Sequence, residues 1–395
     1  ITVTKGAGKL IALQRWWPSI ILLLLLWLTR ITALDEFPFH VDEGIHVRWA
    51  IEVWNGHPFW NISDAKIIGH WPIAAFYPQN AAPFVARMPT VMIAMLGLAA
   101  GYAFIRRLFG FPAAILAGGM WIVTPYLLFY DRMALPDAEA GALGVVTLFA
   151  AYRLGRRMRY QDAVFLGVVQ ALAILFKLTA LPYVFAAILI VLWFGWQQRW
   201  RILRLLGVSV GTSLICFLPP ILYIILRGEA FFAVQSGFVG VTAGQGLSLF
   251  TNLAHFWSLL NGYGETLWLS LVLVGFVSLV LLRARKGAVW LLLGSLPLLT
   301  ILVIGRTVFP RYYGAGLGIL MLLAGAGLGL LIDIAPHGRL RQGIAAVLIG
   351  LLGISGLPFM LTFYTNAAGL TLPEAEREQY YTGPSSGFGI SDAAR

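Results

Sequence analysis

Two adjacent carboxylates, Asp42 and Glu43, begin a long polar segment that follows the first apolar run. A carboxylate can accept the proton that a hydroxyl or an amine loses as it attacks another atom, so it can act as a general base. Asp is also favoured as a helix N-cap, and this structural role stays open as an alternative for Asp42. His46 follows one turn later, and an Asp/His pair at this spacing leaves a divalent metal open as a cofactor.

Isolated basic residues supply a second kind of chemistry. Arg306 and Arg311 lie on either side of a Phe-Pro break between two apolar runs, and Lys177 stands alone between two others. Arginine binds phosphate and carboxylate groups through two parallel hydrogen bonds. An anionic partner would therefore explain the two arginines. For Lys177 the alternative is a long side chain that extends to the membrane interface.

A third polar group lies where the predicted span 112–130 ends and the predicted span 137–152 begins. It contains Asp131, Arg132 and Asp137. Charges at a membrane boundary are costly unless they are paired or functional. The group therefore indicates a site, with a short solvated turn at Asp131 and Arg132 as the alternative.

Composition identifies the environment in which these side chains work. Of the 395 residues, 59% are hydrophobic and only 11% are charged, whereas soluble domains carry about 25% charged residues. The formal charge of +11 comes from short basic clusters between apolar runs, which indicates membrane topology rather than nucleic-acid binding. The single cysteine, Cys216, excludes an intrachain disulfide and cysteine-based metal sites.

The elements that position the candidate residues are transmembrane helices. A span needs about 20 mostly apolar residues, and unbroken apolar runs favour helices over barrel strands. We predict an all-α polytopic bundle of about eleven spans. They cover residues 16–34, 88–105, 112–130, 137–152, 163–176, 178–197, 205–226, 265–282, 288–305, 313–332 and 343–364. The short run 163–176 and its successor form either a tight hairpin or a pair with one misassigned member.

The distribution of basic residues orients the bundle, because cytoplasmic loops are enriched in Lys and Arg. With a cytoplasmic N-terminus in the plasma membrane, every predicted inner segment is basic. These residues are Lys5, Lys9, Arg15, Arg106, Arg107, Arg153, Arg156, Arg157, Arg159, Arg199, Arg201, Arg204, Arg283, Arg285, Lys286, Arg339 and Arg341. The long segments 35–87 and 227–264, and the chain after residue 364, then lie outside.

The first outer loop contains a predicted interfacial helix. Val41, Ile45, Trp49 and Val53 recur every fourth residue, and Asn55-Gly56 ends the pattern as a C-cap does. We expect one transmembrane domain over residues 1–364, with the first outer loop at 35–87. Residues 365–395 are expected to begin an outer segment that continues beyond the given sequence, because both ends of the chain look trimmed.

Together these residues resemble the C-type superfamily of polytopic glycosyltransferases, most closely the protein O-mannosyltransferases and the lipid A aminoarabinose transferases. The resemblance covers most of the chain and rests on several short motifs in order. They are Asp42-Glu43, Ala86-Arg87-Met88-Pro89, Arg106-Arg107-Leu108-Phe109-Gly110, Tyr130-Asp131-Arg132 with Leu135-Pro136-Asp137, Arg311-Tyr312, Tyr380-Tyr381-Thr382-Gly383 and Ser386-Gly387-Phe388-Gly389.

The resemblance implies an enzyme that moves a sugar from a polyprenyl-phosphate donor to a lipid or protein acceptor on the outer face, with inversion. It implies Asp42 as the base with Glu43 as its neighbour, and a site shaped by Asp131 and Asp137. Arg311, Arg306 and Lys177 would hold the donor phosphate, with His46 and Tyr312 beside the substrate. Fixed guanidinium groups would stabilise the anionic leaving group.

One departure concerns the end of the first outer loop. Relatives often carry a Lys-Pro-Pro or Pro-Pro motif there, whereas this chain has Gly69-His70-Trp71-Pro72-Ile73 without the lysine. Two other classes of protein remain as alternatives. A non-catalytic subunit of a larger membrane complex could keep the same fold. A transporter would place its charges mid-membrane and show inverted repeats, and no repeat is evident.

Overall fold

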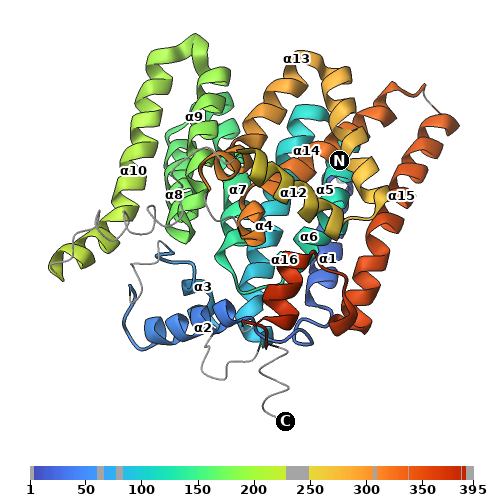
Figure 1. The fold of residues 1–395 in the computed structure, drawn as a ribbon. Coiled ribbons are helices and arrows are strands. Elements are labelled where there is room, and N and C mark those ends of the chain that lie inside the picture. The colour runs from blue at the N-terminus through green and yellow to red at the C-terminus, as the bar shows by residue number, and fades with distance from the viewer. Residues whose placement is uncertain are drawn as a thin grey trace.

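The computed structural model describes residues 4–59, 66–76, 83–227, 249–305, 309–336, 338–383 and 385–387, with side chains from residue 16 onward except at 284 and 285. Over these residues the chain is a helical bundle (Figure 1). In Figure 1 the helices α2 and α3 lie at one end of the bundle, at the bottom of the view. The turn within α13 and the connection from α9 to α10 lie at the opposite end.

The predicted spans fall on helices, so the all-α polytopic fold is confirmed. The helices are α1 (Thr4–Ile31), α2 (Val41–Trp54), α3 (Trp71–Ala75), α4 (Pro83–Phe109), α5 (Phe111–Val123), α6 (Pro125–Tyr130), α7 (Pro136–Arg157), α8 (Tyr160–Phe176), η3 (Leu178–Ala180), α9 (Leu181–Gly195), η4 (Trp196–Gln198), α10 (Arg199–Leu226), α12 (Leu249–Tyr263), α13 (Thr266–Ile304), η5 (Pro310–Tyr313), α14 (Gly314–Ile334), α15 (Arg339–Thr365), η6 (Ala367–Gly369), α16 (Glu374–Arg377) and η7 (Glu378–Thr382).

Within the described chain, six helical stretches are long and apolar enough to cross a membrane. They are Pro83–Phe109, Leu178–Leu226, Thr266–Arg283, Lys286–Ile304, Pro310–Ile334 and Arg339–Thr365. Shorter apolar helices cover Trp16–Ile31, Phe111–Val123 and Tyr160–Phe176. Both members of the doubtful pair are helical: α8 and α9 follow one another, and the short turn η3 joins them.

Helix α13 folds back on itself although its helical backbone is continuous. Gly275 packs against Ala324 of α14, and Gly294 packs against Leu323 of the same helix. A straight helix would separate Gly275 from Gly294 by about 28 Å, so both could not meet neighbouring residues of α14. Gly287 also approaches the backbone of Leu279. The reversal confirms that residues 265–282 and 288–305 are two antiparallel segments.

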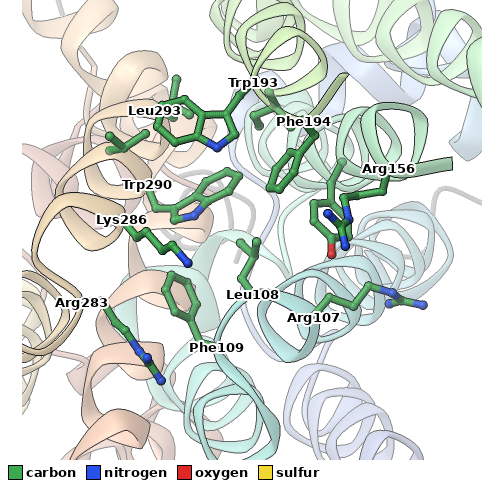
Figure 2. Close-up of a pocket in the computed structure, with 13 residues that line it drawn as sticks. Arg107, Leu108, Phe109, Arg156, Trp193, Phe194, Arg283, Lys286, Trp290 and Leu293 are labelled. Atoms are coloured by element: carbon green, nitrogen blue, oxygen red, sulfur yellow. The ribbon is translucent and has the colours of Figure 1, made fainter. Parts of the chain in front are cut away.

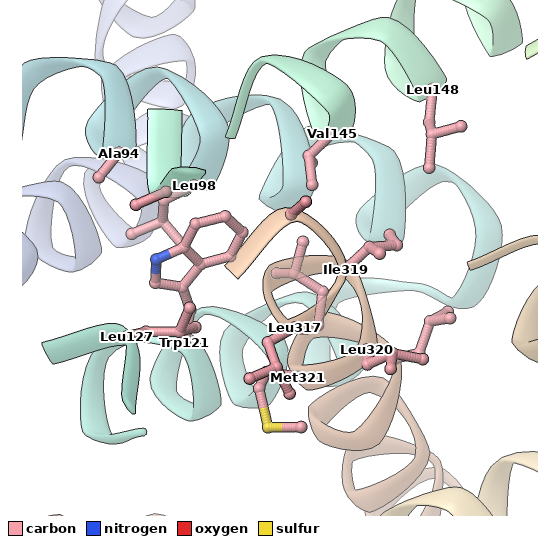
Figure 3. Close-up of a cluster of buried hydrophobic side chains, with 14 of the residues drawn as sticks. Ala94, Leu98, Trp121, Leu127, Val145, Leu148, Leu317, Ile319, Leu320 and Met321 are labelled. Atoms are coloured by element: carbon pink, nitrogen blue, oxygen red, sulfur yellow. The ribbon is translucent and has the colours of Figure 1, made fainter. Parts of the chain in front are cut away.

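Helix α14 forms the centre of the bundle. It is apolar on all sides, and all of its residues from Gly314 to Leu330 are buried. Glycines allow its neighbours to approach: Gly325 and Gly329 meet the backbone of α5, and Gly316 meets Leu298 of α13. Small residues serve this purpose in membranes, where close packing replaces the hydrophobic effect as the source of helix association. Figure 3 shows part of this packing, with Trp121 beside α14 residues such as Leu317.

A helix forms where the sequence predicts one: α2 ends at its C-cap Asn55, with Gly56 following at φ +93°. The alternative role for Asp42 was wrong, because His40 is the N-cap: its ring Nδ1 accepts a hydrogen bond from the Asp42 backbone N–H at 3.2 Å. Glu43 completes the capping box by accepting from the His40 backbone N–H at 3.1 Å. The Asp42 side chain is therefore not needed to cap the helix.

Candidate active site

A cavity of about 280 Å³ lies where α2, the chain before α3, the turn after α8 and η5 meet. Its wall contains five of the predicted site residues together with Ile45, Trp49 and Lys66. The five are Asp42, His46, Lys177, Arg311 and Tyr312. From α2 the wall takes residues 42, 45, 46 and 49, which share one face of a helix at this spacing. The cavity thus combines one face of α2 with cations from three other segments of the chain.

Asp42 and Arg311 form an ion pair across this cavity, with 2.7 Å between Oδ2 and Nη2. Their side chains are 25% and 13% exposed, so the pair is accessible without lying on the open surface. Tyr126 holds the backbone around Arg311, because its hydroxyl donates to the carbonyl of Pro310 at 2.8 Å and to that of Arg311 at 3.1 Å. The position of the guanidinium is thereby tied to the bundle interior.

Glu43 faces away from the cavity and is completely buried. Its carboxylate accepts two hydrogen bonds from Arg87, from Nε at 2.8 Å and from Nη2 at 2.7 Å, and one from the Ala134 backbone N–H at 2.8 Å. Arg87 also donates to the carbonyls of Leu34 and Phe37. These contacts fix the start of α2 against α4, which makes Glu43 a residue that positions Asp42.

His46 and Lys66 form another polar part of the cavity wall. The Nδ1–H of His46 donates to the Ala134 carbonyl at 2.8 Å, which leaves its Nε2 as an acceptor 3.5 Å from the Lys66 ammonium. Burial, and next the charge of Lys66, hold the pKa of His46 well below its ordinary value. A neutral imidazole therefore orients the lysine, whose ammonium also lies 5.7 Å from the Trp49 ring.

Lys177 reaches the cavity from the turn between α8 and η3. Its ammonium pairs with Asp137 at 2.5 Å and lies 4.3 Å from the centre of the Tyr312 ring. Burial lowers the pKa of Lys177 to about 8, and the carboxylate of Asp137 offsets part of that effect. Asp137 thus lies behind the cavity wall and keeps a charged lysine at its surface.

Asp131 lies deeper in the bundle and does not line the cavity. It pairs with Arg30 of α1 at 3.2 Å, and the Trp121 indole N–H donates to the same oxygen at 3.1 Å. Both charged side chains are essentially inaccessible. Arg132 turns in the other direction, donating to the Ala33 carbonyl and lying 4.2 Å from the Phe363 ring. Arg306, the remaining predicted phosphate ligand, lies outside the described residues.

The C-terminal segment packs behind the site. Glu376 is completely buried and accepts a hydrogen bond from the Tyr130 hydroxyl at 2.5 Å. Burial raises the pKa of Glu376 to about 7. The Ser385 carbonyl accepts from the Val41 backbone N–H at 3.2 Å, so the same segment also contacts the first turn of α2. The described tail therefore contacts both Tyr130 of α6 and the residue that precedes Asp42 in α2.

Lys66 is the cavity residue that sequence reasoning missed. The lysine of the Lys-Pro-Pro motif is absent directly before the Trp71-Pro72 position, and Lys66 lies a few residues earlier. The fold brings it to the cavity because the Ile68 N–H donates to the Leu175 carbonyl at 3.1 Å, and Gly69 fits closely against Pro136. A search for any lysine near the end of the loop would have found it.

The donor set around the cavity is cationic rather than metal-binding. Among the described residues, no group of three or more His, Cys, Asp or Glu side chains is placed to hold a metal ion. Both ring nitrogens of His46 are already engaged, because one donates to a backbone carbonyl and the other faces Lys66. Neither is therefore placed to share a metal ion with Asp42. The arrangement suits a bound anion next to a carboxylate.

The chain is similar to known proteins in part of its sequence and in its fold. Residues 67–223 match the model of the dolichyl-phosphate-mannose-protein mannosyltransferase family. The fold matches the crystal structure of ArnT from Cupriavidus metallidurans bound to undecaprenyl phosphate, with a TM-score of 0.64 and 16% identity over 88% of this chain. The chain resembles the C-type glycosyltransferases in sequence and in fold.

The predicted resemblance to this superfamily is therefore confirmed. The family match begins at residue 67, after α2, and includes Arg87, Asp131, Asp137 and Lys177. The chain spans 66% of the length of the ArnT chain that it matches. No curated protein sequence matches the chain.

Proposed function

We propose that this protein transfers a sugar from a polyprenyl-phosphate donor to a hydroxyl or amine of a lipid or protein acceptor. The observation that carries the proposal is the Asp42–Arg311 pair in a cavity that also contains Lys66 and Lys177. One carboxylate beside three cations suits a reaction in which a nucleophile loses a proton while a phosphate leaves.

The charge of the cavity fits the charge that develops in this reaction. A polyprenyl-phosphate sugar is a phosphodiester with one negative charge, and its departure as a phosphomonoester adds a second. Lys177 pairs with Asp137 and Arg311 pairs with Asp42, and Lys66 also lines the cavity. Cations already fixed in place stabilise the developing charge more than the starting donor, which lowers the barrier.

Asp42 is the proposed base. In a single displacement the acceptor attacks the anomeric carbon opposite the leaving phosphate and inverts its configuration. The donor phosphate competes with Asp42 for Arg311, so donor binding frees the carboxylate to accept the acceptor's proton. His46 is neutral, but its Nδ1–H is engaged with a carbonyl and its Nε2 faces Lys66, so it is a weaker choice for the base.

The proposed reaction takes place on the outer face of the plasma membrane. This sidedness rests on the basic segments at the end of the bundle opposite α2 and α3. The cavity lies between an interfacial helix and the ends of apolar helices. A polyprenyl phosphate, whose phosphate lies at headgroup level, could enter it from the lipid.

The test is turnover by the purified full chain in lipid nanodiscs. A panel of polyprenyl-phosphate sugars is supplied with a lipid or peptide acceptor extract, and the products are identified by mass spectrometry. We expect release of polyprenyl phosphate and addition of one hexose or aminopentose mass to an acceptor, with neither product formed by Asp42→Asn. Donor binding without turnover for every donor and acceptor would instead indicate a non-catalytic subunit.

A further inference from the structure

A second polar pocket, of about 290 Å³, lies at the opposite end of the bundle from the candidate active site. It is formed by the end of α4, the last turns of α7 and α9, and the turn region of α13. Its basic residues are Arg107, Arg156, Arg283 and Lys286, one or two from each of three helices (Figure 2). The proposed transfer reaction uses none of them.

The pocket has a strong positive charge that the described part of the chain does not neutralise. The ion pairs formed by described residues involve other basic side chains, such as Arg153 with Asp162 and Arg341 with Asp333. No acidic residue lines the pocket. The four basic side chains are exposed and line the same pocket from three helices, so an anionic ligand in the pocket would be attracted by several cations at once.

The remainder of the wall is aromatic and aliphatic. Trp193, Phe194 and Trp290 lie between the basic side chains, and Leu293 and Val289 continue the wall. Trp290 is buried, whereas Trp193 is 55% exposed on the outside of the bundle. Tryptophan at the end of a span is typical of headgroup level in a bilayer. An amphipathic ligand would use both the cations and this apolar wall, whereas a free phosphate would use only the cations.

A larger apolar cleft adjoins the pocket. It has a volume of about 860 Å³, is lined by Leu23, Ala99 and Phe149 among others, and shares Arg107 with the basic pocket. Two cavities of different polarity with one arginine in common match the two parts of a phospholipid, a charged headgroup and apolar chains. The exposed Trp16 and Ile20 on the cleft wall show that it opens to the outside of the bundle.

We infer that this pocket binds the headgroup phosphate of an anionic phospholipid of the cytoplasmic leaflet. Basic pockets between transmembrane helices on the cytoplasmic side are suited to such headgroups. The assignment to that leaflet rests on the basic residues of the predicted inner segments. The ligand would contact α4, α7 and α13 through their basic residues and α9 through its aromatic residues.

The experiment is native mass spectrometry of the delipidated full chain, titrated with phosphatidylglycerol, phosphatidylcholine or glycerol 3-phosphate. The test variant is Arg283→Ala/Lys286→Ala. The matched control is Arg199→Ala/Arg204→Ala, which removes two exposed cations from another predicted inner segment. Both basic pairs are exposed, so neither change should disturb the fold; the charge-preserving variant Arg283→Lys/Lys286→Arg checks this point.

We expect one phosphatidylglycerol to bind wild type with an affinity about tenfold or more above that of the test variant, because each cation contributes about a factor of five near a lipid surface. The control and the charge-preserving variant should bind like wild type, and phosphatidylcholine should bind weakly. Equal losses in test and control variants would overturn the inference in favour of diffuse attraction. Glycerol 3-phosphate binding as tightly as the lipid would overturn it in favour of a soluble anion.

Discussion

The Asp42 carboxylate lies 2.7 Å from the Arg311 guanidinium, which joins the second residue of an interfacial helix to the turn before the central helix. The two groups that the proposed reaction needs on either side of the anomeric carbon are thus neighbours. This relationship makes their roles separable by substitution, since one should affect turnover and the other donor binding.

Asp42→Asn is expected to reduce sugar transfer by about 10²–10⁴-fold, the range typical of losing a general base. The amide cannot accept the proton, and His40 rather than Asp42 caps the helix, so folding should be unchanged. The measurement is the initial rate of polyprenyl-phosphate release. Glu52→Gln, on the same helix but outside the cavity, is the control. Near-normal turnover by Asp42→Asn would remove Asp42 as the base.

Arg311→Ala should weaken donor binding by one to two decades, because a hydrogen bond to a charged group contributes about 1.5–3 kcal/mol. Arg311→Lys should retain part of the affinity, since it keeps the charge but loses the planar fork. Donor titration followed by thermal shift measures both. Arg48→Ala removes an exposed cation from α2 as the control. Equal affinities in all four proteins would make Arg311 an interfacial anchor only.

Donor affinity is expected to fall as the pH rises through about 8, because the pKa of Lys177 is lowered to about 8 and the ammonium loses its proton there. Lys66, Arg311 and Asp137 are the charged groups that surround it. A phosphodiester does not titrate in this range. Lys177→Arg remains charged, so its donor affinity should stay constant from about pH 7 to about pH 9. A parallel fall in both proteins would assign the pH dependence to another group.

Arg87→Ala and Glu43→Gln should destabilise the protein by about 3–5 kcal/mol, because each leaves a buried partner uncompensated. Thermal unfolding in detergent should show a lower midpoint for both variants, while Asp42→Asn unfolds like wild type. The activity per amount of folded protein distinguishes the two carboxylates: Asp42→Asn should lower it, whereas Glu43→Gln should lower mainly the amount of folded protein. A Glu43→Gln protein of normal stability that lacks turnover would show that Glu43 takes part in the chemistry.

The sidedness is tested with single cysteines in a Cys216→Ser background. Arg157→Cys lies in a predicted inner segment and Thr371→Cys in the tail, and both positions are exposed. An impermeant maleimide added to intact cells should label Thr371→Cys and leave Arg157→Cys unlabelled until the cells are opened. Labelling of both from outside would refute the proposed topology.

The spans and the first interfacial helix could be predicted from sequence because their causes are local. Bilayer thickness sets the length of an apolar run, and a four-residue repeat followed by Asn-Gly sets the extent of α2. The gathering of Asp42, Lys177 and Arg311 in one cavity agrees with the expectation that these residues share a site. That expectation came from a family resemblance, and the roles of the residues remain predictions.

The different environments of Asp42 and Glu43 could not be predicted from the sequence. Neighbouring side chains on a helix point about 100° apart, and only the packing of α2 decides which of the two faces the cavity. The same holds for Asp131, whose partner Arg30 comes from the first span. Lys66 gave no periodic signal and reaches the cavity through contacts with α8. Long-range pairing of this kind leaves no trace in local spacing.

The central position of α14 has a consequence for how the protein is made. This helix is enclosed by α4, α5, α7 and α13, yet it begins only at Gly314, after most of the other spans have been synthesised. When the helices insert in chain order, lipid or a chaperone must therefore occupy the position of α14 among the earlier helices until α14 is synthesised. The glycines that face α5 and α13 allow it to enter at close range. The candidate active site takes Arg311 and Tyr312 from η5, directly before α14, so its assembly must be among the last steps of biogenesis.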